Sequence, residues 1–345
     1  MKNILVTGNM GYIGSIAVPL LLQQGYRVTG YDIGYYDKEC CLYQEESSNY
    51  SQIIKDIRDI SEKDVEGMDA VLHLAALSND PLGEIDPSYT EEINLKATLR
   101  LAEYSKKAGV KRFIYSSSQS MYGISDRDDE LDEDAPKTPL TAYARTKWDA
   151  ECALKKLSSK EFAVVCFRPS TVFGASPKLR CDIVFNNLVA CAYTTGKIEI
   201  KSDGSPWRPV VHVKDVCSAY IAGLQAPVGL VCGQSYNVGI KDGNYTVRNL
   251  AEAAQKAVPG STLIYTGEHG VDSRTYKVSF KKILSELTDY FKPQWDLNNG
   301  AAELVELFQM IHFDEKQFRG RVCNRLQQIG YLIENNKIDS NLRRI

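Results

Sequence analysis

The sequence of 345 residues has few histidines, no long apolar runs and no large excess of either charge. Its four histidines, His73, His212, His269 and His312, fall at no metal-ligand spacing, so we expect no metal site. A formal net charge of -3 gives no broad electrostatic reason for binding DNA, RNA or anionic lipid. We therefore expect no nucleic-acid partner.

The apolar stretches also indicate no membrane segment. The stretch MKNILVTGNMGYIGSIAVPLLL is interrupted by Gly8, Asn9, Gly11 and Gly14, and no small-residue cleavage site follows it, unlike in a signal peptide. No run of about 18 apolar residues occurs elsewhere. The nine cysteines include no CxxC pair, which is typical of buried thiols in a reducing cytosol. We expect a cytoplasmic protein.

Short apolar segments alternate with helical patterns in the first half of the chain. This alternation is typical of a parallel, doubly wound sheet in an α/β protein. After Pro169 the pattern becomes irregular, and a second, smaller lobe is expected there. The predicted strands are residues 2–7, 27–32, 69–76, 112–118 and 162–169, the last three each preceded by a helical segment.

A glycine-rich segment, TGNMGYIG at residues 7–14, follows the first strand and opens a helix. Gly8 allows a tight turn, Gly11 lets the backbone approach a pyrophosphate, and Gly14 lets helix and strand pack closely. The pyrophosphate would bind N–H groups at the positive end of the helix. Asp32 ends the second strand, where an acid accepts hydrogen bonds from a ribose 2′-OH and repels a 2′-phosphate. This pattern predicts NAD rather than NADP as cofactor.

A second motif, LTAYARTKW, places Tyr143 and Lys147 four residues apart at a predicted helix start. Residues at this spacing share one helix face, so both side chains can act on one site. A tyrosine hydroxyl has a pKa of about 10, and an adjacent ammonium lowers it toward the range of a useful base. An ordinary amphipathic helix has the same spacing, but the glycine loop and the segment SSSQSMYG favour a catalytic pair.

Together these motifs resemble the short-chain dehydrogenase/reductase superfamily, in particular its extended branch of nucleotide-sugar epimerases and dehydratases. The resemblance covers nearly the whole chain and implies a Rossmann fold with a smaller substrate-binding lobe. The motifs that carry it are TGNMGYIG (7–14), DIRD (56–59), HLAA (73–76), SSSQSMYG (116–123), YARTK (143–147), RPSTVFG (168–174), NNL (186–188), RPVVHVKDV (208–216) and YNVG (236–239).

The resemblance implies which residues hold the cofactor and act on the substrate. Tyr143 would remove a proton from a sugar hydroxyl, at C4, while hydride leaves that carbon for NAD+. Lys147 would also hydrogen-bond the nicotinamide ribose, and Ser118 would orient the substrate. The implied cofactor-binding residues are Gly8, Gly11, Tyr12, Ile13, Gly14, Asp32, Asp56, Ile57, Leu74, Ala75, Ala76, Asn94, Tyr143 and Lys147.

The implied substrate is a nucleotide-diphosphate sugar, bound by the second lobe. Arg208 and Arg274 match the family's arginines that grip the diphosphate, and a planar guanidinium suits phosphate oxygens. Asn187 matches an amide donor to the same group. Thr171 stands where the family usually has asparagine, and it keeps a hydroxyl but loses the amide. The resemblance therefore leaves the pose of the sugar open.

Three reactions can start from the same 4-keto intermediate. We expect a 4-epimerase, with a 4-dehydrogenase that releases the ketone as the alternative. Relatives that act as 4,6-dehydratases usually carry Asp-Glu directly after the Ser/Thr position, where this chain has Gln119 and Ser120, so a dehydratase is disfavoured. A non-catalytic dinucleotide sensor is disfavoured because Ser118, Tyr143 and Lys147 are intact.

The sequence predicts two domains. The NAD-binding domain would cover residues 1–169 with a returning segment at about 209–237. Residues 170–208 and 238–345 would form the nucleotide-sugar-binding lobe and the C-terminal tail, of which 314–345 looks helical and has no assigned function. The acidic segment 126–136 is interpreted as a solvated loop.

The resemblance further implies a homodimer, or an oligomer built from dimers. In the family, helices matching residues 94–107 and the helix beginning near Tyr143 pack against their twofold mates as a four-helix bundle. Apolar residues recur at helical spacing on both segments, although the same stripes could simply face the sheet. They are Leu95, Leu99 and Ala102 on the first, and Trp148 and Cys152 on the second.

Overall fold

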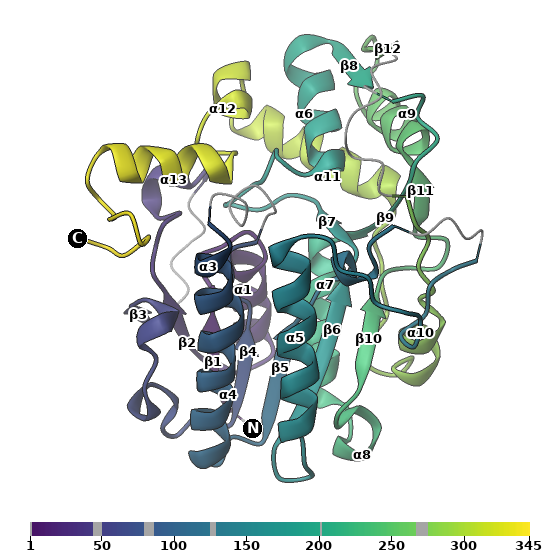
Figure 1. Cartoon of the computed structure of the whole chain (residues 1–345). Helices are drawn as coiled ribbons and strands as arrows, with labels where there is room; N and C mark the ends of the chain where they lie inside the picture. Colours follow the sequence, from purple (N-terminus) through teal and green to yellow (C-terminus); the bar gives the residue numbers. More distant parts are fainter. Residues whose placement is uncertain (1, 44–49, 79–85, 125–128, 201, 267–274) are drawn as a thin grey trace.

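The computed structural model describes residues 2–43, 50–78, 86–124, 129–200, 202–266 and 275–345. A seven-stranded sheet runs in the order β3-β2-β1-β4-β5-β6-β10, and all of its neighbouring pairs are parallel (Figure 1). This confirms the predicted doubly wound α/β fold. The strands are β1 (Asn3–Thr7), β2 (Arg27–Asp32), β3 (Ser51–Ile54), β4 (Ala70–His73), β5 (Arg112–Ser116), β6 (Ala163–Pro169) and β10 (Ser235–Val238).

Helices cover both faces of this sheet. On one face lie α1 (Gly14–Gln23) and α7 (Val213–Gln225), and on the other lie α4 (Ala97–Lys107) and α5 (Ala142–Leu157) (Figure 1). Successive strand residues point to opposite faces, so Ile4 and Val6 belong to one buried cluster and Leu5 to the other. Burial on both faces explains why the central strands are almost continuously apolar.

The helical segment predicted before β4 is present only as short turns, with no α-helix among the described residues between β3 and β4. The chain there forms two 3-10 helices, Ile57–Asp59 and Glu62–Val65. The Asp56 side chain accepts a hydrogen bond from the Arg58 amide, and Ser61 and Asp64 form a capping box, so each turn is closed after a few residues. The short crossover leaves the edge strand β3 and the residues after it close to β2.

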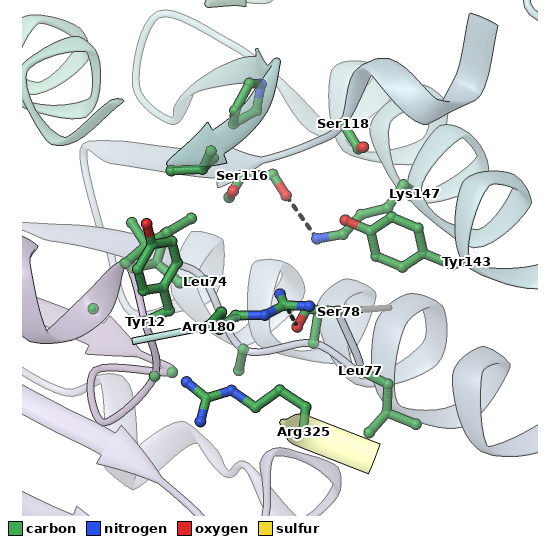
Figure 2. A pocket seen from close by; sticks show the side chains of 18 of the residues that line it. Tyr12, Leu74, Leu77, Ser78, Ser116, Ser118, Tyr143, Lys147, Arg180 and Arg325 are labelled. Carbon is green, nitrogen blue, oxygen red and sulfur yellow. Dashed lines mark hydrogen bonds between the residues drawn. The ribbon is translucent and has the colours of Figure 1, made fainter. Parts of the chain in front are cut away.

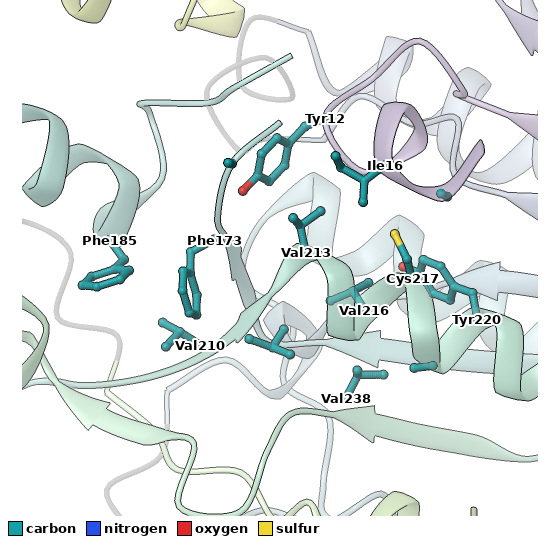
Figure 3. Close-up of a cluster of buried hydrophobic side chains, with 14 of the residues drawn as sticks. Tyr12, Ile16, Phe173, Phe185, Val210, Val213, Val216, Cys217, Tyr220 and Val238 are labelled. Carbon is teal, nitrogen blue, oxygen red and sulfur yellow. The ribbon is translucent and has the colours of Figure 1, made fainter. Parts of the chain in front are cut away.

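The second lobe contains a three-stranded sheet in the order β11-β9-β7 and a two-stranded sheet of β12 and β8. Phe173, Phe185 and Val210 of this lobe share a buried cluster with Val213 and Tyr220 of α7, so the two lobes pack through a continuous core (Figure 3). The elements after β6 are β7 (Thr171–Phe173), α6 (Val184–Thr195), β8 (Lys197–Ile200), β9 (Trp207–His212), α8 (Val228–Val231), β11 (Asn244–Thr246), α9 (Val247–Ala257), β12 (Thr262–Tyr265), α10 (Lys281–Glu286) and α11 (Leu297–Met310). The helical stretch before α4 consists of α3 (Pro87–Thr90) and a π-helix (Glu91–Lys96), and two further 3-10 helices span Lys38–Cys40 and Gln119–Tyr122.

The C-terminal tail returns to the first lobe. It forms α12 (Glu315–Arg319) and α13 (Arg325–Glu334), and the following residues lie beside β2 and the turn after β3 (Figure 1). Ile329, Leu332, Ile338 and Leu342 are buried in the same cluster as Leu5 of β1. The tail is helical only in part, since residues 335–345 form turns and one isolated bridge.

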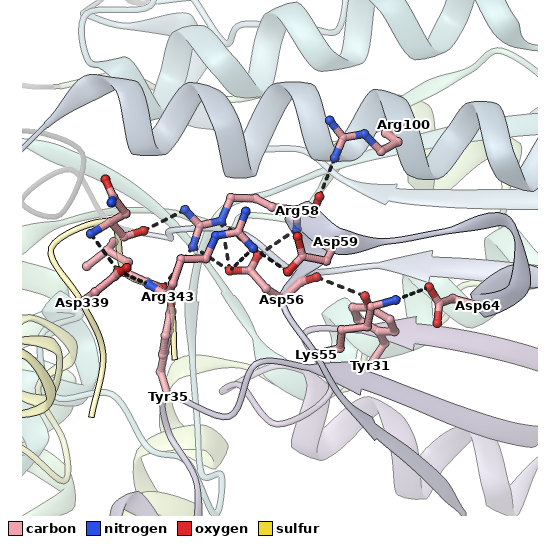
Figure 4. A network of polar contacts seen from close by, with 12 residues as sticks. Tyr31, Tyr35, Lys55, Asp56, Arg58, Asp59, Asp64, Arg100, Asp339 and Arg343 are labelled. Atoms are coloured by element: carbon pink, nitrogen blue, oxygen red, sulfur yellow. Dashed lines mark hydrogen bonds and ion pairs between the residues drawn. The ribbon is translucent and has the colours of Figure 1, made fainter. Parts of the chain in front are cut away.

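A polar network also ties the tail to the turn after β3 (Figure 4). Arg58 binds the Asp56 carboxylate at 2.6 Å and donates to the carbonyl oxygens of Asn341 and Leu342 at 2.8 and 3.0 Å. Arg343 lies 3.6 Å from the same carboxylate. Because Asp56 and Arg58 are buried, these contacts fix the tail to the well-packed turn that follows β3.

The acidic segment is less solvated than its composition suggested. In its described part, Leu131 is buried and pairs with Val278, and the buried Glu133 accepts a hydrogen bond from the Asn237 amide at 2.7 Å. The prediction of a solvated loop was therefore wrong for Leu131 and Glu133, whereas Asp132 between them is exposed. Within the described residues, no helix is long and apolar enough to cross a membrane, and no group of three potential metal ligands occurs.

Candidate active site

A cavity of about 600 Å³ opens at the carboxyl ends of the central strands (Figure 2). It runs from the glycine loop and Asp32 to Thr171 and Arg208 of the second lobe. Doubly wound sheets bind ligands at this edge, where the strand order reverses between β1 and β4. Its volume lies within the range of natural ligand sites.

The glycine loop adopts the conformation that its sequence predicts. Gly8 has φ of 72°, and a Cβ there would lie 2.6 Å from the backbone nitrogen of Ala75. A Cβ on Gly14 would collide with the carbonyl oxygen of Gly8. Both positions therefore require glycine, which brings the turn and the start of α1 against the HLAA segment after β4. The result is a helix N-terminus facing the cavity.

Asp32 is held in place by two backbone amides. Its Oδ2 accepts from the Met10 N–H at 3.1 Å and its Oδ1 from the Gly34 N–H at 2.7 Å. Burial raises the pKa of this carboxyl, while the two amides and the charges of Lys178 and Arg325 oppose the rise. A carboxylate fixed beside the glycine loop fits the ribose hydroxyls of a dinucleotide. The residues present therefore fit NAD.

Tyr143 and Lys147 both project into the cavity from α5, whose first turn is capped by Thr141. The Lys147 Nζ lies 5.9 Å from the centre of the Tyr143 ring and 4.9 Å from that of Tyr115. It donates to the Ser116 carbonyl oxygen at 2.7 Å (Figure 2). Burial lowers the pKa of Lys147 to about 7. The pair thus places a phenol beside a buried lysine whose amine can be either charged or neutral near pH 7.

Ser118 lies just beyond the end of β5 and caps the 3-10 helix Gln119–Tyr122. Its Oγ lies 2.9 Å from the Ser120 Oγ and accepts from the Ser120 amide at 3.2 Å. Gln119 is a buried lining residue whose Nε2 donates to the Arg168 carbonyl oxygen at 3.0 Å. The hydroxyls of Ser118 and Ser120 thus form the polar wall near Tyr143.

Three carboxylates line the cavity within the described residues, and each already has partners. Asp32 accepts from two amides, Asp56 is bound by Arg58, and Asp182 is bound by Arg180 at 2.9 and 3.0 Å. Carboxylates held in this way are poor candidates for a second acid and base beside Ser118.

Most residues implied by the resemblance line this cavity. Asn94 and Asn187 do not: Asn94 instead holds the backbone of Leu77 through bonds of 2.8 and 3.1 Å, and Asn187 donates to the Cys181 carbonyl oxygen at 2.8 Å. Arg274 lies outside the described residues. The residues that line the cavity as expected are Gly8, Gly11, Tyr12, Ile13, Gly14, Asp32, Asp56, Ile57, Leu74, Ala75, Ala76, Ser118, Tyr143, Lys147, Thr171 and Arg208.

Several important residues were missed from the sequence. Asn186, beside Asn187, accepts from the Gly174 amide at 3.0 Å and donates to the Tyr12 hydroxyl at 3.2 Å, so it positions Tyr12. Arg180 and Arg325 also line the cavity. The charge of Arg180 next to the NNL helix was an available signal, but nothing in the sequence around Arg325 indicated that it reaches this site.

A glycine loop, a fixed acid at the end of β2 and a Tyr-Lys pair in one cavity define a dinucleotide-dependent enzyme of the Rossmann type. The chain belongs to the NAD dependent epimerase/dehydratase family, whose model matches residues 4–239. It is therefore an NAD-dependent enzyme of a family that acts on nucleotide sugars.

Relatives within this family differ in reaction. The chain is 31% identical over 321 residues to a UDP-glucose 4-epimerase of Mycolicibacterium smegmatis, covering 88% of this chain and 98% of the relative. It is 27% identical over 324 residues to a dTDP-D-glucose 4,6-dehydratase of Mus musculus, covering 89% of each. The solved structure of MoeE5 in complex with UDP-glucose and NAD is 25% identical, with a TM-score of 0.74 over 90% of this chain and 99% of that one.

Proposed function

We propose that this enzyme is a nucleotide-sugar 4-epimerase, which inverts C4 through a transient 4-keto sugar. The observation that carries the proposal is that Ser118, Tyr143 and Lys147 line one cavity with the glycine loop and Asp32. The relative from Mycolicibacterium smegmatis with the same described activity supports the choice of reaction.

The chain's own groups would control the proton at the sugar O4. When bound, NAD+ supplies the hydride acceptor and later the hydride donor for C4. Tyr143 takes the proton of the C4 hydroxyl and gives it back after the ketone has turned. The Lys147 ammonium, 5.9 Å from the Tyr143 ring, stabilises the phenolate. Ser118 offers its hydroxyl to the same sugar oxygen.

The nucleotide diphosphate would be bound in the second lobe. Arg208 is the second residue of β9 and lines the cavity, and a guanidinium there can donate two hydrogen bonds to phosphate oxygens. Thr171 on β7 lines the same region and offers a hydroxyl. Arg274 is assigned to the diphosphate on the resemblance alone.

A 4,6-dehydratase needs an additional acid and base for the loss of water. The three carboxylates that line the described part of the cavity are already bound to amides or arginines, which argues against a dehydratase. A 4-dehydrogenase is the remaining alternative, because it uses the same Tyr-Lys pair.

To separate the reactions, the purified enzyme is mixed with UDP-, GDP-, CDP- and dTDP-sugars without added oxidant. The epimerase predicts a C4-inverted sugar over many turnovers, with little absorbance change at 340 nm. A ketone in stoichiometric amount with NADH identifies a dehydrogenase, and a 4-keto-6-deoxy sugar a dehydratase.

We also propose that the enzyme forms a homodimer through α4 and α5, which lie side by side on one face of the molecule (Figure 1). Half-exposed apolar side chains there are Leu95 of the π-helix before α4, Leu99 of α4, and Trp148 and Cys152 of α5. Ala102 is fully buried in the core and is not part of the proposed interface. Light scattering at micromolar concentration should give twice the chain mass, and a single chain mass would reject the dimer.

A further inference from the structure

The cavity contains a buried arginine that the proposed reaction does not use. Arg325 is the first residue of α13 in the C-terminal tail, and its side chain is 2% exposed. Figure 2 shows it extending from α13 into the cavity, toward Arg180 and Tyr12. Its chain position is far from every cofactor motif, so the folded tail alone brings it there.

The guanidinium of Arg325 is held firmly but is not fully bonded. It stacks on the Tyr36 ring at 4.0 Å, and its Nη2 donates to the Lys178 carbonyl oxygen at 2.7 Å. Its Nη1 is buried and has no hydrogen-bond partner within the described part of the chain. Burial lowers the pKa of this group, yet an arginine remains charged at neutral pH. An unpaired buried donor of this kind costs stability unless a ligand binds it.

Arg180 provides the contrast in the same cavity. Its guanidinium is neutralised by Asp182 through two hydrogen bonds, at 2.9 and 3.0 Å, and its Nη1 donates to the Ser78 hydroxyl. Arg325 has no comparable carboxylate contact among the described residues. Of these two arginines, the one on the tail is therefore the one without an ion pair among the described residues.

The position of Arg325 indicates which anion it meets. Tyr36 and Tyr35 follow β2 and its Asp32, and the tail's Gln328 donates to the Tyr35 carbonyl oxygen at 2.9 Å. Arg325 therefore lies on the side of the cavity where a dinucleotide passes from Asp32 to the glycine loop. Arg208, which we assign to the sugar nucleotide, belongs to the second lobe. The charged group of NAD in that stretch is its pyrophosphate.

We propose that Arg325 donates to a phosphate oxygen of the NAD pyrophosphate, so that the C-terminal helix α13 forms part of the cofactor site. The tail then does more than cover the edge of the sheet. Its anchoring through Leu342 and Arg58 sets the position of Arg325, and the cofactor in turn gives the buried guanidinium its missing partner. This inference depends on NAD as cofactor and is the same for an epimerase or a dehydrogenase.

The test compares Arg325→Met with Arg325→Lys, which keeps the charge but loses the planar fork. Arg321→Met is the matched control, since Arg321 lies in the same tail, stacks on Tyr331 at 3.9 Å and pairs with Glu39 outside the cavity. Calorimetry on protein freed of cofactor measures binding of NAD, ADP-ribose, NADP and adenosine. We expect Arg325→Met to weaken NAD and ADP-ribose alike, roughly 10- to 100-fold, as for a lost charge-assisted hydrogen bond. Arg325→Lys should lose less affinity for NAD and ADP-ribose, and Arg321→Met should keep the affinity of the unmutated protein.

Adenosine, which lacks phosphate, should bind the Arg325→Met variant as it binds the unmutated protein. Three results for this variant would each overturn the pyrophosphate contact. They are an unchanged NAD affinity, an equal loss of affinity for adenosine, and a loss of affinity confined to NADP. Thermal unfolding separates binding from folding. The cofactor-free variant should melt no lower than the unmutated protein, whereas its stabilisation by NAD should shrink. A lower melting temperature with undiminished NAD stabilisation would make Arg325 a structural residue only. None of these measurements depends on which reaction the enzyme catalyses. A negative result would therefore reject the role of Arg325 and not the assignment as an epimerase.

Discussion

The two ends of the cavity are built differently. At the cofactor end, β1, the glycine loop and α1 are consecutive in the chain, and Asp32 ends the next strand. At the end where we propose that the sugar binds, Thr171 and Arg208 come from separate strands of the second lobe. A ligand common to the whole family can be bound by local backbone geometry, whereas a variable sugar is bound by side chains from distant segments. The reaction type is therefore easier to derive than the substrate.

The largest expected effect comes from Tyr143, the proposed general base between the two ends. Tyr143→Phe should lower turnover roughly 10²- to 10⁴-fold, the usual contribution of a positioned general base, and leave NAD binding intact. Tyr115→Phe is the control, because Tyr115 also lies next to Lys147 but its hydroxyl is buried without a partner among the described residues. Steady-state rates with the best nucleotide sugar measure both. Normal turnover in Tyr143→Phe would remove Tyr143 from the mechanism.

The next effect concerns the buried charge of Lys147. Its pKa is about 7 in the folded protein, below the ordinary lysine value, so its charged form is disfavoured by folding. This cost is fully present below about pH 7 and disappears as pH rises toward the unfolded pKa of about 10.5. Lys147→Met should thus be more stable than the unmutated, cofactor-free protein by a few kcal/mol at pH 6, and the difference should shrink by pH 9.5.

Denaturant unfolding at pH 6, 8 and 9.5 measures this trend. The exposed Lys156 lies on the same helix, and Lys156→Met should show no comparable change with pH. A stability difference for Lys147→Met that is constant over this range would contradict the buried, partly neutral lysine.

A smaller effect is expected at the cofactor end alone. Asp32→Asn keeps an oxygen that can accept from the Met10 or Gly34 amide but removes the negative charge. We expect NAD affinity to fall roughly tenfold and the preference over NADP to narrow, because the repulsion of a 2′-phosphate is lost. Calorimetry with both cofactors tests this. Equal affinities for NAD and NADP in the unmutated enzyme would refute the role of Asp32.

The sequence predicted most of the cofactor end because its signals are local. Gly8, Gly14 and Asp32 lie where a strand-turn-helix pattern requires them, and Tyr143 and Lys147 share a helix face by spacing alone. The NNL motif was ambiguous, since adjacent helix residues point about 100° apart, and Asn186 rather than Asn187 faces Tyr12. Only the contacts of the folded chain reveal which one is used.

Long-range contacts explain the other misses. Arg325 reaches the cavity through long-range contacts, because α13 bonds to Tyr35 and the residues after it bond to Arg58, more than 250 residues earlier in the chain. Glu133 is buried by its bond to the Asn237 amide, a contact that an acidic composition cannot indicate. Such positions depend on tertiary packing, which overrides local pattern.

The measurement that tests the central claim most directly follows the hydrogen at C4. The enzyme is incubated with its best nucleotide sugar in deuterated buffer without added oxidant, and the product is analysed by NMR and mass spectrometry. If C4 is oxidised and reduced within one closed cavity, the product is inverted at C4 and carries no deuterium there, and turnover continues. Deuterium at C4, or a 4-keto sugar that stops at one equivalent per enzyme, would contradict the 4-epimerase.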